Sequence, residues 1–542
     1  MTRLAGGGLL SGLRSLAGMD GGRPAAGLRR LGGLRRTRPL LPGRAERPPG
    51  RVVSWAVASI VDAGLVVGVA TMLCGLAGIG DDNVDAAAFS CVGAVGAALA
   101  AVARRRVAPP DRPGAGRVFA GIGLLWAVLV LFGTAVYAGT GSLARLDDAL
   151  VESAAGFTTT SLTLLDAAEA SRSVLLFRAA TSWVGGLMAV WIGVVTLPIV
   201  LRSTALIGYS SGRRGLDLVP SAATGRRRVL LLYSGFTAAC VVAYLLTGLG
   251  VTEALVVGLG TASTGGFTGR ADSLAGYGAA TQAVAGAGMF LAGAGIFVIW
   301  WIARGRLRPL WRSQEFRTFV LLLAAATTAM ALHRGVGVGE AAFMAVSAMS
   351  TTGFAVVDWT GWGTATTVIL LVAAGIGSMM GSAGGGMRVM RVQLLMGSAG
   401  GELRRQLDPY AVVLVRRDRE TLSQRTLDRL GGHQVAYVAL VGCGAMLLGV
   451  SGVSLLGSVW GSVSAVTTFG PAVGEIGAFG LLEGVDRAER LALVPLMMGG
   501  RMSVPPVLAG VGLVLNWYKA MERRVRFSAR GGFRLGDDPD DS

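Results

Sequence analysis

Ten long apolar stretches, spaced along almost the whole chain, limit its fold more than any other feature of the sequence. They lie at residues 53–79, 86–103, 118–140, 174–201, 229–249, 281–303, 318–334, 364–396, 434–455 and 491–517. A helix needs about 20 mostly apolar residues to cross a bilayer, and in lipid the backbone polar groups must be satisfied within the helix itself. Only 15% of the residues are charged, and 84 are glycine, which lets membrane helices pack closely. The sequence therefore predicts an all-α polytopic membrane protein with ten transmembrane helices.

Arginines cluster after every second apolar stretch, and the other junctions are mostly acidic or neutral. The clusters include Arg104, Arg105 and Arg106, then Arg226, Arg227 and Arg228, then Arg304, Arg306, Arg308 and Arg312, then Arg404 and Arg405, and finally Arg523 and Arg524. Because cytoplasmic loops carry the excess of arginine, we expect a multi-pass plasma membrane protein with both termini in the cytoplasm. The net charge of +18 then belongs to a membrane face beside lipid, and no nucleic-acid partner is expected.

The first fifty residues hold ten arginines among Gly, Leu and Pro, which predicts a disordered cytoplasmic arm. The alternative is that part of this arm precedes the true start of the protein. Cys74, Cys91, Cys240 and Cys443 stand singly in apolar segments, so we interpret them as buried small side chains. Only two histidines are present, and no nucleophile–base pair or nucleotide motif is evident, so an enzyme is not expected.

Four of the predicted outer loops share an unusual pattern of a short apolar stretch followed by a Thr/Gly cluster. The stretches are Asp148–Gly156, Glu253–Ala262, Glu340–Met349 and Leu456–Val466. Each is too short to cross a bilayer, but it has the length of a half-helix that dips into the membrane from outside. The acidic residues of these loops, Asp148, Glu152, Glu253, Glu340 and Glu475, are expected to form a negative vestibule and in part to stabilise the half-helix N-termini.

The Thr/Gly clusters predict a selectivity filter built from backbone carbonyls. Irregular backbone at membrane depth is tolerated only where it is buried in protein or lines a water-filled path, and a ring of carbonyls can replace the hydration shell of a cation. The predicted filter residues are Thr158, Thr159, Thr160, Ser161, Thr264, Gly265, Gly266, Thr351, Thr352, Gly353, Thr468, Phe469 and Gly470. Among them, the predicted K⁺ ligands are Thr159, Thr160, Gly265, Gly266, Thr352, Gly353, Phe469 and Gly470.

A glycine-rich interruption and a buried arginine predict a gate below this filter. Residues Ser378–Gly386 interrupt an apolar stretch, and Arg501 lies inside another, where a charge costs about 2.5–3.5 kcal/mol on insertion scales. The predicted gate residues are Gly381, Ser382, Gly384, Gly385, Gly386 and Arg501. The alternatives are a close-packed or flexible glycine stretch and an arginine that reaches to the membrane interface. For Arg388 two roles are equally favoured: a part in the gate and an anchor at the cytoplasmic face of the membrane.

These motifs, in this order, resemble the Trk/Ktr/HKT superfamily of potassium transporters, over roughly residues 53–525. The segments that carry the resemblance are Glu152–Thr160 with Arg178 and Trp183–Gly186, Ser263–Phe267, Met349–Ala355, Gly381–Arg388, Phe469–Pro471 with Gly474 and Glu475, and Gly500 with Arg501. The resemblance implies four helix–pore helix–helix repeats around a central pore, plus two additional N-terminal helices. It implies K⁺ uptake gated by an intramembrane loop, a homodimer, and a cytosolic nucleotide-binding regulatory subunit of the TrkA/KtrA type.

The resemblance also divides the chain. The expected parts are an arm at 1–50, two extra helices at 51–107, pore repeats at 108–204, 205–308 and 309–400, a cytoplasmic linker with the fourth repeat at 401–526, and a tail at 527–542.

One residue departs from the family pattern. Ser161 stands where members of this superfamily usually carry glycine, and plant members with serine there resemble Na⁺-permeable transporters. K⁺ is the expected ion, with a Na⁺-permeable or Na⁺-coupled cation transporter as the alternative and a sodium-coupled organic solute carrier as a remote one. No organic cofactor is expected in this chain.

Overall fold

The computed structural model describes residues 51–52, 55–80, 83–108, 115–196, 218, 222–333, 335–408, 410, 415–417, 420–422, 424–482 and 484–502. The predicted arm at 1–50 and tail at 527–542 lie outside these residues. The described residues belong to one compact unit, which begins at residue 50.

Within the described residues, six helices are long and apolar enough to cross a membrane. Their spans are Trp55–Ala77 in α1, Asn83–Arg106 in α2, Gly116–Gly139 in α3 (Ala115–Gly139), Arg172–Thr196 in α5 (Arg172–Trp191) with the π-helical turn η1 (Ile192–Thr196), Thr224–Leu246 in α8 (Ala222–Leu246), and Leu427–Val450 in α17 (Gln424–Val450). A seventh is counted if α10 (Ala279–Ala294) and α11 (Ile296–Ala303), which meet at a bend of 107°, form one broken span. The multi-pass helical character is thus confirmed, whereas the total of ten spans remains a prediction.

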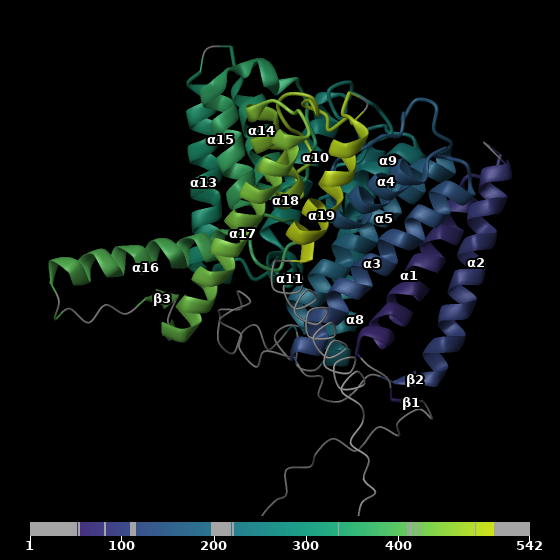
Figure 1. Cartoon of the computed structure of the whole chain (residues 1–542), viewed down its shortest axis with the longest axis horizontal. Helices are drawn as coiled ribbons and strands as arrows, with labels where there is room; N and C mark the ends of the chain where they lie inside the picture. Colours follow the sequence, from purple (N-terminus) through teal and green to yellow (C-terminus); the bar gives the residue numbers. More distant parts are fainter. Residues whose placement is uncertain are drawn as a thin grey trace, which may run out of the picture. The chain divides into compact units, whose positions relative to one another are not determined.

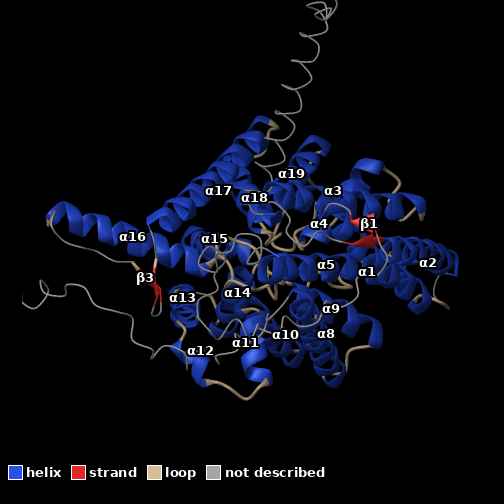
Figure 2. Cartoon of the chain, turned by 90° about the horizontal axis from the view of Figure 1, so that it is seen from below, coloured by secondary structure: helices blue, strands red, loops and turns tan. Residues whose placement is uncertain are grey.

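The predicted span at 364–396 contains two helices, and they are separated by a segment that includes the glycine-rich interruption expected at Ser378–Gly386. Helix α15 (Thr364–Ile376) has 13 residues, or about 20 Å, which is shorter than the hydrocarbon core. Gly377 ends α15 with a φ of 72°, an irregular loop follows, and α16 (Val389–Leu407) then leaves the bundle at a steep angle to its neighbours (Figures 1 and 2). A high glycine content inside an apolar stretch has broken the helix rather than tightened its packing.

Four short helices of 13 residues each occupy the positions of the predicted half-helices. They are α4 (Leu146–Thr158), α9 (Val251–Ser263), α14 (Val338–Ser350) and α18 (Leu455–Thr467). Each one packs against the helix that precedes it and the helix that follows it, so α4 lies between α3 and α5, α9 between α8 and α10, α14 between α13 (Gln314–Ala331) and α15, and α18 between α17 and α19 (Arg487–Met502). Figure 1 shows these short helices toward the same end of the bundle.

The remaining elements are small. Helix α12 (Arg308–Arg312) follows α11, and the 3₁₀ turn η3 spans Trp359–Trp362. Two pairs of two-residue strands complete the described part: β1 (Arg51–Val52) with β2 (Val107–Ala108), and β3 (Arg416–Arg417) with β4 (Glu420–Thr421).

Helices α1 and α2 form a closely packed pair because glycines lie at their crossing. A Cβ on Gly68 would overlap the backbone of Ala97, and a Cβ on Gly93 would overlap the backbone of Met72. This is the close backbone approach that small residues permit in membrane helices. The opposite face of α2 leaves large apolar side chains exposed, as expected for a surface covered by lipid.

The core surrounds the C-terminal ends of the four short helices. It includes their buried side chains together with the large aromatic residues Trp126, Trp359 and Trp460. The prediction that all four cysteines are buried is wrong for two of them, because Cys91 and Cys443 are exposed while Cys74 and Cys240 are buried. Their apolar segments are spanning helices with one outward face, which composition alone does not distinguish from the inward face.

Candidate functional site at the ends of four short helices

The four short helices end in the same unusual backbone conformation. The residue after each helix is a threonine in the left-handed region: φ is 57° at Thr159, 55° at Thr264, 55° at Thr351 and 58° at Thr468. A β-branched residue rarely adopts a positive φ, and residues held in such regions cost about 1–3 kcal/mol each and cluster at functional sites. Four equivalent outliers therefore mark this region of the molecule.

The hydrogen bonds at these ends are also equivalent. In α4, Thr160 N–H donates to Ala155 O at 2.9 Å and Thr159 N–H donates to Gly156 O at 2.9 Å. This pair of bonds is the Schellman arrangement, which satisfies the last carbonyls of a helix and turns the chain out of it. The same two bonds recur from Gly265 and Thr264 in α9, Thr352 and Thr351 in α14, and Phe469 and Thr468 in α18.

All thirteen predicted filter residues are buried, and the structure brings the four segments together around Ser161. A Cβ on Gly266 would overlap Ser161 Oγ, and a Cβ on Gly353 or Gly470 would come within 2.6 Å of Ser161 Cβ. Neighbouring segments also touch, because the same added Cβ atoms would overlap Thr352 O beside Gly266 and Phe469 O beside Gly353. Segments that are about one hundred residues apart in sequence thus form one junction.

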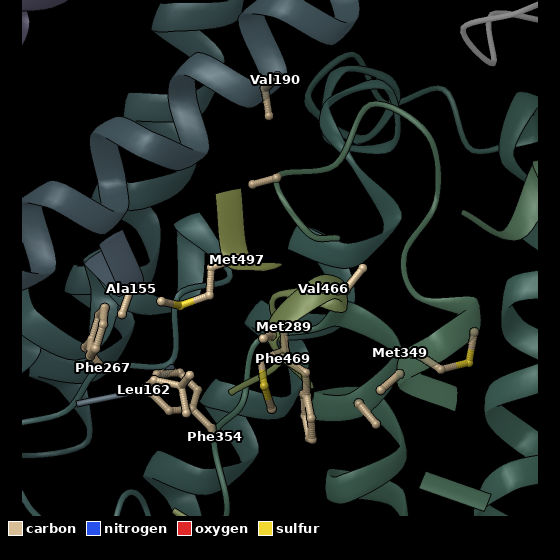
Figure 3. Close-up of a cluster of buried hydrophobic side chains, with 14 of the residues drawn as sticks. Ala155, Leu162, Val190, Phe267, Met289, Met349, Phe354, Val466, Phe469 and Met497 are labelled. Atoms are coloured by element: carbon tan, nitrogen blue, oxygen red, sulfur yellow. The ribbon is translucent and has the colours of Figure 1, made fainter. Parts of the chain in front are cut away.

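Apolar side chains pack around this junction. Figure 3 shows Leu162, Phe267, Phe354 and Phe469, which come from the four different segments or directly follow them, in the same buried cluster. None of these four side chains is more than 3% exposed. The junction is therefore a packed element of the core and not a surface loop.

Ser161 differs from its three counterparts in backbone conformation. Gly266, Gly353 and Gly470 have φ values of 64°, 86° and 97°, whereas Ser161 does not adopt a positive φ. The Cβ of serine disfavours the left-handed region that glycine enters freely. The replacement of the usual glycine by Ser161 is therefore accompanied by a different backbone conformation in the first segment.

Two threonine hydroxyls at the junction are buried without a hydrogen-bond partner among the described residues. They are Thr159 Oγ1 and Thr468 Oγ1, at equivalent positions of the first and fourth segments. At the other two positions, Thr264 Oγ1 donates to Ser263 O at 2.6 Å, and Thr351 Oγ1 accepts a bond from Gly385 N–H at 2.7 Å. Buried oxygens without partners are costly, and an oxygen lining suits a cation that has lost its water.

Glu152 supports the first segment from behind. It is fully buried in the middle of α4 and accepts bonds from Leu164 N–H at 2.8 Å and Thr163 Oγ1 at 3.0 Å. Arg178 of α5 donates to the same Thr163 Oγ1 at 3.0 Å and to the carbonyl of Thr268. The expectation that Glu152 stabilises a helix N-terminus is wrong, because its carboxylate instead binds the chain that leaves the first segment.

The acids that do lie at the N-terminus of α4 are paired with arginines. Asp147 contacts Arg487 at 2.7 Å and Asp148 contacts Arg490 at 3.2 Å, so the first turns of α4 and α19 are joined. Desolvation raises the pKa of Asp147, but the bond from Arg145 and the neighbouring arginine charges outweigh it and lower that pKa below its usual value. These two carboxylates are therefore not a free negative vestibule, which corrects the expectation for Asp148.

Two other outer acids lie at the starts of short helices. Glu340 Oε2 accepts from Gly337 N–H at 3.4 Å at the start of α14, and Glu475 Oε1 accepts from Ser454 N–H at 3.4 Å at the start of α18. Glu253 lies in the first turn of α9. Carboxylates at these positions are favourable because the helix N-terminus carries partial positive charge.

The loop at residues 377–388 lies against the junction. Gly385 N–H donates to Thr351 Oγ1, and a Cβ on Gly385 would overlap Thr467 O. Within the loop, Ser378 Oγ and Ser382 Oγ share a hydrogen bond of 2.6 Å. The predicted gate glycines thus include one in direct contact with the third and fourth segments.

Arg501 joins this loop to another helix. Its side chain is only 8% exposed, and its guanidinium donates to the carbonyl of Ala383 in the loop and, at 3.2 Å, to Gly185 O in α5. An arginine that reaches to the membrane interface is therefore not what the structure shows. Arg501 and the loop, which the sequence assigned to the same gate, are in direct contact.

Two further residues hold the loop: Arg388, whose role the sequence left undecided, and Glu315, which was not predicted as a site residue. Arg388 Nη1 donates to Ser382 Oγ at 2.6 Å and to Ser378 Oγ at 2.9 Å, and Glu315 Oε1 accepts from Met380 N–H at 2.7 Å. Arg388, which directly precedes α16, has a positive φ of 75°. Glu315 lies in the first turn of α13 among arginines, so nothing in the local sequence distinguishes it from a surface acid.

The break between α10 and α11 is also tied to this loop. Ile296 N–H donates to Gly381 O at 3.0 Å, and Met379 N–H donates to Gly293 O at 3.0 Å. Gly295 between them has a φ of 87°, and a Cβ there would overlap the backbone of Gly381 and Ser382. The only signal for this break in the sequence was the Gly–Ala–Gly triplet at 293–295.

Comparison with known proteins places this arrangement in a family. The family model for TrkH, described as a cation transport protein, matches residues 130–512. Two relatives are the Trk system potassium uptake protein TrkH of Halomonas elongata, 29% identical over 70% of this chain and 82% of the relative, and TrkG of Escherichia coli K12, 26% identical over 67% of this chain and 77% of the relative.

A solved structure has the same fold. The crystal structure of the potassium transporter TrkH from Vibrio parahaemolyticus superposes with a TM-score of 0.72, with 23% sequence identity, and covers 83% of this chain and 97% of that protein. The family match begins within α3 and takes in all four short helices, the 377–388 loop and Arg501. Because the family model matches more than half of its length, this chain belongs to the TrkH family of cation transport proteins.

Proposed function

We propose that this chain takes up K⁺ across the plasma membrane through a filter formed by residues 158–161, 264–266, 351–353 and 468–470. Its curated relatives are named potassium uptake proteins. The observation that carries the proposal is the convergence of four helix ends with the same left-handed threonine and the same hydrogen bonds on one buried junction.

Main-chain oxygens and threonine hydroxyls are the chemistry that such a junction offers a cation. The proposed K⁺ ligands are the residues predicted from sequence: Thr159, Thr160, Gly265, Gly266, Thr352, Gly353, Phe469 and Gly470. The hydroxyl of Thr159 has no hydrogen-bond partner among the described residues, which supports an additional oxygen ligand for the cation. The four helices end at this junction, and the negative ends of their dipoles favour a cation there.

The proposed gate is the 377–388 loop together with Arg501. The loop contacts the filter at Gly385, and Arg501 holds the loop at Ala383. A positive charge at this depth repels a cation that leaves the filter toward the cytoplasm. In this arrangement the loop and Arg501 obstruct the path, and K⁺ passes when the loop withdraws from the junction.

Na⁺ permeation through the same path is the second candidate, and Ser161 favours it. Its side chain lies against the glycines of all three other segments, and its φ differs from theirs. One carbonyl of the ring would then point differently from the other three, which weakens the match to one ion size.

The arginine-rich helix ends support an orientation in which the outer ends of the four short helices face the exterior and both termini face the cytoplasm. We further propose a homodimer that docks a cytosolic nucleotide-binding regulatory subunit on the arginine-rich face. The relatives' names refer to a Trk system, which supports a complex with other components.

Uptake of ⁸⁶Rb⁺ and ²²Na⁺ into vesicles reconstituted with the full chain tests the proposal. If the chain takes up K⁺, Rb⁺ should enter the vesicles, and unlabelled K⁺ should reduce this Rb⁺ entry more than unlabelled Na⁺ does. Equal competition by the two ions, or ²²Na⁺ entry without Rb⁺ entry, would favour the Na⁺-permeable candidate, and entry of neither ion would contradict both. Growth of a K⁺-uptake-deficient bacterium at low K⁺ is the matching test in cells.

A further inference from the structure

We propose that residues 302–312, where α11 turns into α12, form a binding site for anionic phospholipid headgroups at the inner surface of the membrane. The inference goes beyond K⁺ conduction and rests on the orientation proposed above.

The backbone places this turn along the membrane surface. Helices α10 and α11 meet at a bend of 107°. In the orientation proposed above α10 crosses the membrane, so a helix at this angle to it runs close to the membrane plane. The five-residue helix α12 follows after Arg304 to Leu307, so the chain stays near the surface before α13 returns into the bundle.

The turn carries dense positive charge. Arg304, Arg306, Arg308 and Arg312 lie within nine residues, all four are exposed, and no acidic residue occurs between Trp301 and Gln314. Each basic residue near an anionic membrane surface contributes about 1 kcal/mol to attraction. Charge of this kind is complementary to a headgroup phosphate.

Apolar and aromatic side chains lie between these arginines. Trp311 is 62% exposed, Leu307 is 55% exposed and Ile302 is 42% exposed. Trp300 lies under two guanidinium groups, with Arg304 at 3.9 Å and Arg228 at 5.8 Å from its ring centroid. Exposed Trp and Leu beside Arg is the composition of a membrane-interface anchor, which favours a lipid over a soluble acidic protein.

The site is joined to the proposed gate through the backbone. Helix α11 begins at the break where Ile296 N–H donates to Gly381 O, and Met379 N–H donates to Gly293 O across the same break. Lipid that holds the turn therefore also fixes the segment to which the loop is hydrogen-bonded. We expect anionic lipid to change the rate of ion passage as well as to bind.

The binding test uses native mass spectrometry of the purified full chain, with phosphatidylglycerol and phosphatidylcholine as competing probes. The test variant carries R304Q, R306Q, R308Q and R312Q, and the control removes the same charge elsewhere with R105Q, R106Q, R404Q and R405Q. We expect phosphatidylglycerol to bind the unmodified chain preferentially, the test variant to lose this binding at least about tenfold, and the control to keep it. The half-variants R304Q/R306Q and R308Q/R312Q should give intermediate losses, which covers the case in which the fourfold variant does not fold.

Three results would overturn the proposal. They are equal binding of the two lipids, an equal loss in the test and control variants, and a test variant that keeps the lipid but loses a cytosolic protein partner. The last result would assign the turn to protein docking instead.

Flux measurements test the link to the gate. Rb⁺ uptake into vesicles of phosphatidylcholine alone should differ from uptake with added phosphatidylglycerol, and the test variant should lose this difference. Lipid binding without any lipid effect on flux would overturn the link to the gate, and absence of flux in every lipid would contradict the proposed function while leaving the binding result intact.

Discussion

Gly385 N–H donates to Thr351 Oγ1 at 2.7 Å, so a loop residue is hydrogen-bonded to the threonine that ends the third short helix. The same glycine lies against Thr467 O of the fourth. The loop and the ends of two short helices therefore form one packed unit, and movement of the loop must break a contact with the junction itself.

A methyl group at Gly385 should push the loop off the junction. The Cβ of Gly385→Ala would overlap Thr467 O, and overpacking of this kind costs about 1–3 kcal/mol. If the docked loop is the closed state, basal Rb⁺ flux in vesicles should rise about tenfold, because 1.4 kcal/mol is a factor of ten in a population. Gly400→Ala in α16 is the matched control, since nothing lies within 4 Å of its added Cβ. Unchanged or reduced flux in Gly385→Ala would contradict the gate role of the loop.

Removal of the Ser161 side chain should sharpen ion selectivity. Ser161→Gly allows the positive φ that Gly266, Gly353 and Gly470 adopt and clears the centre where these three glycines meet the serine. We expect the ratio of Rb⁺ to Na⁺ uptake to increase several-fold. Ser161→Ala keeps the Cβ and should leave the ratio nearly unchanged, which separates the backbone effect from the hydroxyl. Equal ratios in the glycine and alanine variants would refute this account of Ser161.

The sequence was sufficient to predict the position of each short helix and the segment that follows it. Thr159, Thr264, Thr351 and Thr468 could be aligned because the same apolar stretch and cluster recur four times, and a repeat is visible without knowledge of distant contacts. Arg501 could be singled out for a similar reason, since a charge in an apolar stretch conflicts with its surroundings. Both signals are local.

The contacts that hold the site could not be predicted in the same way. Glu152 was assigned to a helix N-terminus, but its partner Leu164 lies beyond the first segment, a placement that depends on how the chain turns. The interruption at Ser378–Gly386 was visible as a glycine-rich segment in the apolar stretch at 364–396, but the partners of that segment in other helices were not. The break at Gly295 is stabilised by Gly381 and Met379, which are distant in sequence and visible only in the fold.

Loss of the Arg501 guanidinium should raise leak through the path. Arg501→Ala removes the bonds to Ala383 O and Gly185 O, and a bond from a charged group is worth about 1.5–3 kcal/mol. We expect basal Rb⁺ flux to rise about tenfold or more. Arg501→Lys keeps the charge but cannot reach two carbonyls in the same fork geometry. Its Rb⁺ flux should therefore lie between the fluxes of the unmodified protein and the alanine variant. If the alanine variant conducts no faster than the unmodified protein while it remains folded by size-exclusion chromatography, Arg501 is not part of the barrier.

Loss of the Glu152 charge should destabilise the first segment without any direct change at the gate. The carboxylate is fully buried and accepts from Leu164 N–H and Thr163 Oγ1, and Arg178 lies on the other side of the same threonine. Glu152→Gln replaces one acceptor oxygen with an amide donor and leaves the buried Arg178 charge without its nearby counter-charge, at a cost of about 1–3 kcal/mol. The midpoint of thermal unfolding in detergent should therefore fall by several degrees. Glu340→Gln is the matched control, because that carboxylate caps α14 at the exposed start of the helix and its loss should cost well under about 1 kcal/mol. A Glu152→Gln protein as stable as Glu340→Gln would show that this buried network does not support the filter, since an unpaired buried guanidinium cannot be accommodated without loss of stability.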